Sequence, residues 1–140
     1  MERLAREQDV VYTRYADDLY FSSRRRDVLS AFPGEVHRIV GDLALPGNLV
    51  VNDTKTFHSS RKGRRVVTGL VLTPDGGVSI GRARKRYIRH LVHHFEELGE
   101  AERKQLQGWI AFAVGIEPDF ANRLVLKYGD ARYNQATGKA

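Results

Sequence analysis

Residues 10–23 read VVYTRYADDLYFSS, an apolar and aromatic run whose middle is interrupted by Ala16, Asp17 and Asp18. Valine, tyrosine, threonine and phenylalanine favour extended backbone, whereas aspartate is common in tight turns. The pattern therefore predicts two short strands joined by a tight turn that carries two adjacent carboxylates.

Two neighbouring carboxylates repel each other unless something positive lies beside them. Mg²⁺ prefers hard oxygen ligands, and it typically takes one or two carboxylates together with substrate phosphates. In nucleotidyl transfer, two metal ions about 4 Å apart activate the attacking oxygen and stabilise the leaving one. Taken alone, however, the pair Asp17-Asp18 is better explained as ordinary turn residues.

The chain divides near residue 81 into a β-rich half and a helical half. Apolar residues at helical spacing predict a helix that starts near Pro33 and stops before Pro46. A strand-like run at 66–72, a turn at 73–77 and a returning strand at 78–80 predict a second hairpin. Three further helices are predicted between residues 82 and 131, followed by a loose polar tail at 132–140. The expected fold class is α+β.

The charge is basic, with 23 lysines and arginines against 17 acids and a net charge of +6 over 140 residues. Residues 61–89 hold nine of these bases and a single acid, Asp75. A field of one sign attracts polyanions, so nucleic acid is favoured over a merely solvated basic face. The sequence contains no cysteine and no long apolar run, which favours the cytoplasm and excludes a membrane span.

Several motifs in order give the carboxylate pair a context. Tyr15-Ala16-Asp17-Asp18 between two hydrophobic strands resembles the metal-binding motif of reverse transcriptases, and TRYADDLYFS resembles the version found in retron-type and group II intron-type enzymes. Asn52-Asp53-Thr54-Lys55-Thr56 is similar to a segment that follows the palm helix in those enzymes, and Val67-Thr68-Gly69 to their Val-Thr-Gly motif. The likeness extends over about residues 8–130.

The resemblance implies an RNA-directed DNA polymerase, with a role for each matching residue. Asp17 and Asp18 match Mg²⁺ ligands, and Lys55 matches a lysine near the phosphates of the incoming dNTP. Tyr15 and Ala16 match positions beside the DNA primer terminus. Thr68 and Gly69 match a motif associated with recognising a structured non-coding RNA; read without the family, they are a strand threonine and a bulge glycine.

The helix expected after residue 81 begins with a cluster of bases. Arg82, Lys85, Arg86 and Arg89 share a face at helical spacing, which would suit contact with the phosphates of a template–primer duplex. The neighbouring His90, His93 and His94 have no cysteine or further ligand at a familiar spacing, so a zinc site is disfavoured. Trp109 lies among apolar residues and is expected in the core rather than as a platform for base stacking.

The resemblance implies two domains in this chain. Residues 1–81 correspond to part of a palm, and residues 82–131 correspond to a helical thumb. The family also uses a third carboxylate and a fingers lobe, and neither is recognised upstream of Tyr15. The expectation is a portion that is inactive without the missing fingers and third carboxylate, working on an RNA template with a DNA primer in a cytoplasmic, antiviral setting. Three explanations stay open for the missing part: a truncated gene, a split enzyme whose fingers–palm part is a separate chain, or an excised portion. The alternatives are a stand-alone basic RNA-binding module and an inert remnant.

Overall fold

The stretch 10–23 forms the expected antiparallel hairpin in the computed structural model, which describes residues 1–139. Five consecutive pairs join its strands, from Val11 opposite Ser22 to Tyr15 opposite Asp18. The hairpin belongs to a first unit, Met1–His58. Its elements are α1 (Glu2–Glu7), β1 (Val11–Tyr15), β2 (Asp18–Ser22), the 3₁₀ turn η1 (Val28–Ala31), α2 (Phe32–Gly41) and the 3₁₀ turn η2 (Asp53–Lys55).

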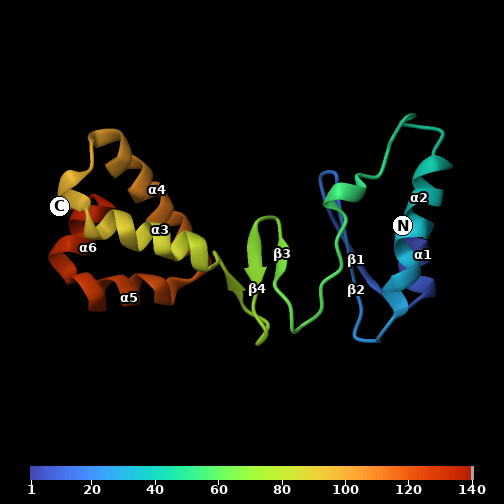
Figure 1. Ribbon diagram of the computed structural model, residues 1–140, viewed down its shortest axis with the longest axis horizontal. Helices are drawn as coiled ribbons and strands as arrows, with labels where there is room; N and C mark the ends of the chain where they lie inside the picture. The colour runs from blue at the N-terminus through green and yellow to red at the C-terminus, as the bar shows by residue number, and fades with distance from the viewer. Residues whose placement is uncertain (140) are drawn as a thin grey trace. The chain divides into compact units, whose positions relative to one another are not determined.

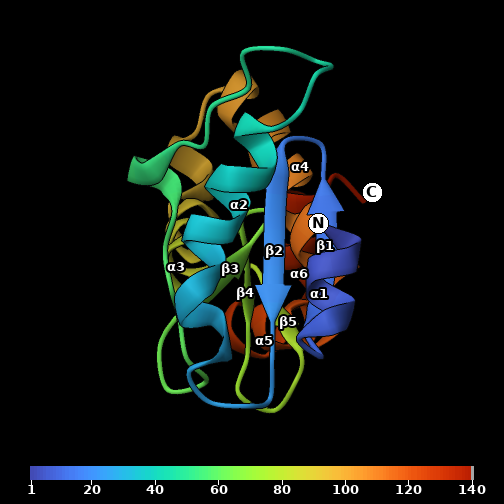
Figure 2. The ribbon, with the colours of Figure 1, turned by 90° about the vertical axis from the view of Figure 1, so that its right-hand side faces the viewer.

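One face of this hairpin is covered by helices. In Figures 1 and 2, α1 and α2 lie on the same side of β1 and β2. The rings of Tyr12 and Phe21 stack across the strands with centroids 5.1 Å apart, and Phe21 lies 5.1 Å from Phe32 on α2. Ala5 and Phe32 are almost fully buried beside them. This small core fixes the hairpin by aromatic packing.

The second unit, Ser59–Ala140, begins with a three-stranded antiparallel sheet in the order β3-β4-β5. The strands are β3 (Arg65–Val67), β4 (Leu70–Leu72) and β5 (Val78–Ser79). The prediction of one continuous strand over residues 66–72 is wrong, because the chain reverses between Val67 and Leu70, which pair with each other. The expected turn at 73–77 does connect β4 to β5.

Helices complete the second unit and supply most of its core. They are α3 (Arg82–His93), the 3₁₀ turn η3 (Phe95–Glu97), α4 (Glu100–Ile116), α5 (Pro118–Tyr128) and α6 (Asp130–Thr137). Pro118 opens α5 and Gly129 follows it, as the sequence predicts. Figure 1 shows the four α-helices gathered into one bundle. The fully buried residues between them include Ile88, Leu106, Ile110, Phe120 and Leu124.

Two expected boundaries differ from the structure. Residues 130–137 are helical, whereas the sequence analysis expects a loose tail from 132 onward; Ala136 is fully buried and Tyr133 packs on the core. The division into units falls between His58 and Ser59 rather than near residue 81. The sheet joins the helices because Ile80 lies in their core, with Leu70 packed against it.

The fold class is α+β, as predicted, with two small antiparallel sheets and helices in both units. Within residues 1–139, no helix combines the length and the apolar composition that crossing a membrane requires.

Candidate functional site

The two aspartates lie at the tip of the first hairpin. Tyr15 pairs with Asp18, so Ala16 and Asp17 form a two-residue loop. Ala16 has a positive φ of 51°, as the first loop position of a primed hairpin turn requires. The Arg14 side chain donates from Nε to the Ala16 carbonyl at 2.6 Å and so braces the loop. The tip is thus held in a single sharp turn.

Both carboxylates face solvent. Asp17 and Asp18 are exposed, and the Tyr20 hydroxyl donates a hydrogen bond to Asp18 Oδ2 at 3.1 Å. Carboxylate oxygens are the ligands that Mg²⁺ prefers, so this donor pair fits the metal that the resemblance implies. Within the described residues 1–139, no group of three or more potential metal ligands gathers anywhere. The tip therefore offers two carboxylates.

Lys55 ends a short turn in the same unit. Asn52 Oδ1 accepts hydrogen bonds from the Thr54 backbone N–H at 3.1 Å and the Thr54 hydroxyl at 2.7 Å, which shows that Asn52 fixes this turn. The imidazole of His37 on α2 lies 3.0 Å from a carboxylate oxygen of Asp53. The Lys55 side chain is exposed. Among residues 1–139 it makes no ion pair with Asp17, and the structure does not bring these groups into contact.

The Val-Thr-Gly motif forms the turn between β3 and β4. Thr68 and Gly69 are the two loop residues, with φ of 47° and 79°, the signs that a type I′ turn needs at both positions. Glycine adopts this conformation readily, but it is a genuine outlier for a β-branched threonine. The expected strand threonine and bulge glycine are therefore wrong, and the motif is a projecting turn.

Arg84 fixes this turn to the first helix of the bundle. Its Nη1 donates to the carbonyl oxygen of Gly69, and it lies 3.4 Å from the carbonyl oxygen of Ile80. A Cβ added at Gly69 would meet Arg84 Nη2 at 3.3 Å, so the side chain passes close under the turn. From the sequence alone, Arg84 is only one of the bases of residues 61–89, because its partners lie 15 and 4 residues away.

The four bases expected to contact phosphate differ in their surroundings. Arg82 and Arg86 are exposed, and neither has an ion-pair partner among residues 1–139. Arg89 is half-buried, with its guanidinium 5.3 Å from the centre of the Phe120 ring. Lys85 is mostly buried, and its Nζ lies 2.6 Å from an oxygen of Glu117. Arg82 and Arg86 are thus the two most available for a polyanion.

Glu117, which the sequence analysis did not single out, joins the sheet to the helices. Its carboxylate accepts hydrogen bonds from the Ser79 hydroxyl at 2.9 Å, the Ile80 N–H at 3.0 Å and Lys85 Nζ at 2.6 Å. Burial by itself would raise the pKa of Glu117, but these three donors together hold that pKa below its ordinary value. Only the fold brings these partners together, since they lie 32 to 38 residues away in sequence.

His90 and His93 of α3 both contact His94, which follows the helix. The rings of His90 and His94 have centroids 4.6 Å apart, and His93 meets His94 edge-on at 4.9 Å. His94 Nδ1 lies 3.0 Å from a carboxylate oxygen of Glu97, which lowers the pKa of Glu97 through that hydrogen bond. These contacts are those of a packed, partly exposed cluster.

Comparison with known proteins gives these motifs a family, although no family model matches the chain. The chain is 41% identical over 131 residues to the retron Ec83 reverse transcriptase of Escherichia coli, covering 90% of this chain and 41% of that protein. It is 32% identical over 142 aligned positions to the retron Ec86 reverse transcriptase of the same species, covering 91% and 40%.

A third relative comes from another bacterium. The retron Mx65 reverse transcriptase of Myxococcus xanthus is 34% identical over 122 residues, covering 86% of this chain and 27% of that protein. The chain thus spans about two fifths or less of the length of these curated relatives. Over some nine tenths of its own length, the chain is homologous to a part of the retron reverse transcriptases.

Proposed function

We propose that this chain is the C-terminal palm and thumb portion of a retron-like RNA-directed DNA polymerase. The observation that carries the proposal is the pair of exposed carboxylates, Asp17 and Asp18, on a braced two-residue hairpin tip. The likeness to retron reverse transcriptases supports the same assignment. The substrates would be dNTPs, a DNA primer and an RNA template, as the resemblance implies.

In this proposal, the residues of the hairpin tip and Lys55 on η2 each have a role. Asp17 and Asp18 hold Mg²⁺, which when bound supplies activation of the attacking oxygen and charge stabilisation at the leaving group. Tyr15 and Ala16 lie beside the primer terminus. Lys55 holds the phosphates of the incoming nucleotide, where an ammonium favours the negative charge of departing pyrophosphate. The resemblance implies a third carboxylate in the fingers–palm portion of the family, which these 140 residues do not match.

The second unit would hold the RNA. Arg82 and Arg86 are exposed at the start of α3 and suit phosphate contacts, which fix register without reading sequence. The Thr68-Gly69 turn projects between β3 and β4 and suits recognition of a structured RNA. Strain at Thr68 supports this role, because unfavourable backbone conformations cluster at functional sites. Arg89 and Lys85 contribute less direct contact, since both already have partners.

The test is primer extension on an RNA template by this chain mixed with the N-terminal part of a retron reverse transcriptase. Extension is expected to need Mg²⁺ and both polypeptides. The double variant Asp17→Asn/Asp18→Asn should lower the rate by at least about a thousandfold, since metal-ion catalysis is lost. Asp9→Asn, an exposed acid in the same unit, is the control and should keep the wild-type rate. Extension that survives the double variant would refute the metal role.

A second candidate function is that of a stand-alone RNA-binding module, favoured by the exposed Arg82 and Arg86. Binding of hairpin RNA to the chain alone, measured at several salt concentrations, distinguishes this module from the polymerase portion proposed above. Each lost phosphate contact should reduce the slope of log affinity against log salt by about one. Arg82→Ala/Arg86→Ala should therefore weaken binding and flatten this slope, whereas Asp17→Asn should leave it unchanged. Unaltered binding by the arginine variant would exclude this module.

A further inference from the structure

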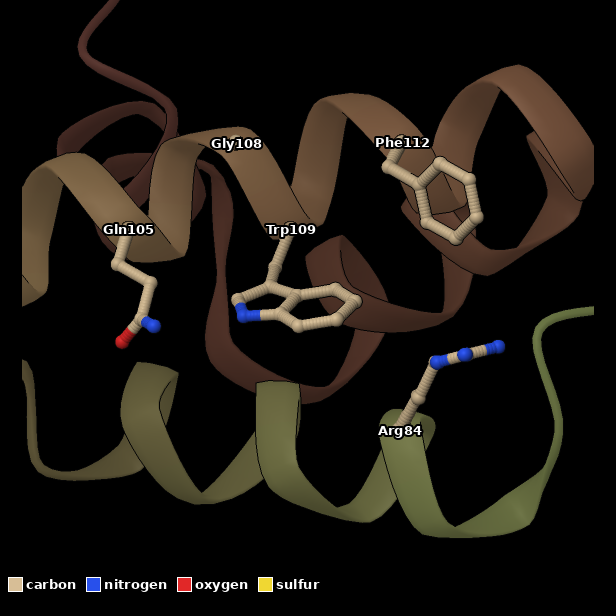
Figure 3. Close-up of a pocket in the computed structure, with 5 residues that line it drawn as sticks. All are labelled: Arg84, Gln105, Gly108, Trp109 and Phe112. Carbon is tan, nitrogen blue, oxygen red and sulfur yellow. The ribbon is translucent and has the colours of Figure 1, made fainter. Parts of the chain in front are cut away.

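An aromatic hollow lies on the surface of the second unit, between α3 and α4. It is lined by Arg84 from α3 and by Gln105, Gly108, Trp109 and Phe112 from α4. Figure 3 shows the side chains of Gln105 and Trp109 reaching from α4 toward α3, and Arg84 reaching back from α3. Trp109 is only half-buried, and Phe112 is 42% exposed. Trp109 therefore packs against the core on one side without being fully enclosed, contrary to the sequence expectation.

The helical pattern of α4 explains why these two rings are only partly buried. Leu106, Ile110 and Ala113 form the buried face of the helix and are at most 1% exposed. Trp109 and Phe112 lie beside this face, with ring centroids 6.2 Å apart and nearly perpendicular planes. An exposed aromatic group of this kind forfeits burial energy. Such a surface indicates a ligand more readily than a packing requirement.

Gly108 leaves the wall of the hollow open. Apart from its chain neighbours and the nearby backbone of α4, a Cβ built on Gly108 meets no atom within 4 Å. Glycine within a helix costs roughly 1 kcal/mol relative to alanine. No packing neighbour therefore requires glycine here, and the missing side chain keeps space beside the Trp109 ring.

The polar groups of the hollow are cationic or neutral. Arg84 is held by the carbonyl oxygens of Gly69 and Ile80, which orients its guanidinium. The Tyr87 hydroxyl donates to Gln105 Oε1 at 3.3 Å, which leaves the amide NH₂ of Gln105 available to a ligand. No acid lines the hollow. A flat ring, a guanidinium and an amide together match a nucleobase that stacks and is hydrogen-bonded at its edge.

We propose that this hollow binds an unpaired nucleobase of the RNA, stacked against Trp109 beside the Arg84 guanidinium. The proposal rests on the RNA binding proposed above and assigns a specific recognition site to it. Charge complementarity selects the occupant, since α3 presents Arg82 and Arg86 to a phosphate backbone within the same unit. A base inside a duplex is covered by its neighbours, so only a looped-out or single-stranded base reaches the ring.

The chain carries its own reporter, because Trp109 is its single tryptophan. Its fluorescence should be quenched in a saturable way by an RNA stem–loop with unpaired loop bases. A fully paired RNA duplex with the same number of phosphates should bind without quenching. If neither RNA binds, the proposed function fails; if both bind and neither quenches, only the nucleobase site is refuted.

Two glycine substitutions on α4 make a matched pair in the full chain. Gly108→Leu fills the hollow, whereas Gly115→Leu adds the same side chain at an exposed position of the helix that also has nothing within 4 Å. Gly108→Leu should lose the quenching and bind the stem–loop about tenfold more weakly, the typical loss of one stacked base. Its affinity for the duplex should stay at the wild-type value.

Gly115→Leu should match the wild type in both assays. Far-ultraviolet circular dichroism checks that each variant keeps its helix content, which leucine should favour over glycine. Phe112→Ala, which removes an exposed wall of the hollow, gives a second reading and should also weaken stem–loop binding selectively. Wild-type affinity and quenching in Gly108→Leu would overturn the proposal.

Discussion

Positive φ angles place strain at the β1–β2 and β3–β4 turns. Ala16 and Thr68 are both L-residues with φ near 50°, at the first loop position of a two-residue turn. Each such residue costs of order 1–3 kcal/mol relative to a relaxed turn. Asparagine and glycine fill such positions at lower cost. Ala16 and Thr68 are thus less favourable for turn stability than asparagine or glycine would be.

Replacing Thr68 separates stability from binding. Thr68→Asn creates Asn-Gly, the preferred pair for a type I′ turn, and should raise the free energy of unfolding of the second unit by about 1 kcal/mol. The same change should weaken stem–loop RNA binding if the threonine contacts the RNA. Thermal denaturation and an RNA titration measure the two effects. A destabilised variant would show that the threonine is not strained, and unchanged RNA affinity would remove it from the interface.

At the scale of elements, Glu117 links β5, α3 and the start of α5. Ser79 and Ile80 donate to it from the end of the sheet, and Lys85 donates from the first turns of α3. Because Arg84 on the same helix holds the Gly69 carbonyl, the projecting turn and α3 are positioned together. A displacement of α3 would therefore also displace the Thr68-Gly69 turn.

The ion pair between Glu117 and Lys85 makes the free energy of unfolding of the second unit depend on pH in a defined way. The pKa of Glu117 is lowered in the folded chain from an ordinary value of 4.5, so its stabilising contribution is present above pH 4.5 and is lost as pH falls through the folded-state pKa. Glu117→Gln should lower the free energy of unfolding by about 2 kcal/mol at pH 7, because Lys85 loses its partner.

Thermal denaturation at several pH values between 7 and 3 measures the contribution of Glu117 to the free energy of unfolding. The difference in the free energy of unfolding between wild type and Glu117→Gln should become smaller as pH falls below 4.5. Glu97→Gln is a suitable comparison, since the pKa of Glu97 is also lowered but this carboxylate is exposed and should contribute little. A difference that stays constant down to pH 3 would contradict the role assigned to the Glu117 carboxylate.

The elements differ in how well local sequence predicts them. The first hairpin is predictable because its aromatic strands and its turn residues agree, and α5 because proline and glycine mark its ends. The turn at Thr68 is missed since threonine favours strands, and only pairing of Val67 with Leu70 forces it into the left-handed region. α6 is missed because a polar sequence buries little there beyond Ala136 and Tyr133.

The residues of the candidate site are likewise predictable only where the signal is local in the sequence. Asp17, Asp18 and the Asn52 turn are readable because each motif is contiguous in sequence. Helical spacing predicts that Lys85 lies with the exposed bases, but its partner Glu117 lies 32 residues away and is brought to it by the fold. The aromatic hollow was missed for a similar reason, since Arg84 and Trp109 meet only when α3 and α4 pack together.

At the scale of the whole molecule, the chain consists of two units with separate cores. Phe32, at 4% exposure, lies in the core of the first unit, and Leu106, fully buried, lies in the core of the second. The first core is small and aromatic, whereas the second gathers helices and one end of a sheet. Each unit therefore has its own source of cooperativity.

Scanning calorimetry should consequently resolve two unfolding transitions. Phe32→Ala and Leu106→Ala each remove a buried side chain and should cost about 3 kcal/mol in the unit that contains it. The first variant is expected to lower only the transition of residues 1–58, and the second only that of residues 59–140. A single transition that both variants shift equally would show that the units unfold as one.

The position of Glu117 also sets an order in time. The β3–β4 hairpin closes a two-residue turn and can form within about 1–10 μs from local contacts alone. The end of β5 is different, because the hydrogen bond from the Ile80 N–H to Glu117 spans 37 residues. Contacts of such long range must first overcome the entropy of loop closure. We therefore expect the hairpin turns of the sheet to form first, and the hydrogen bond from Ile80 to Glu117 to form only after the helices have brought Glu117 to the end of β5.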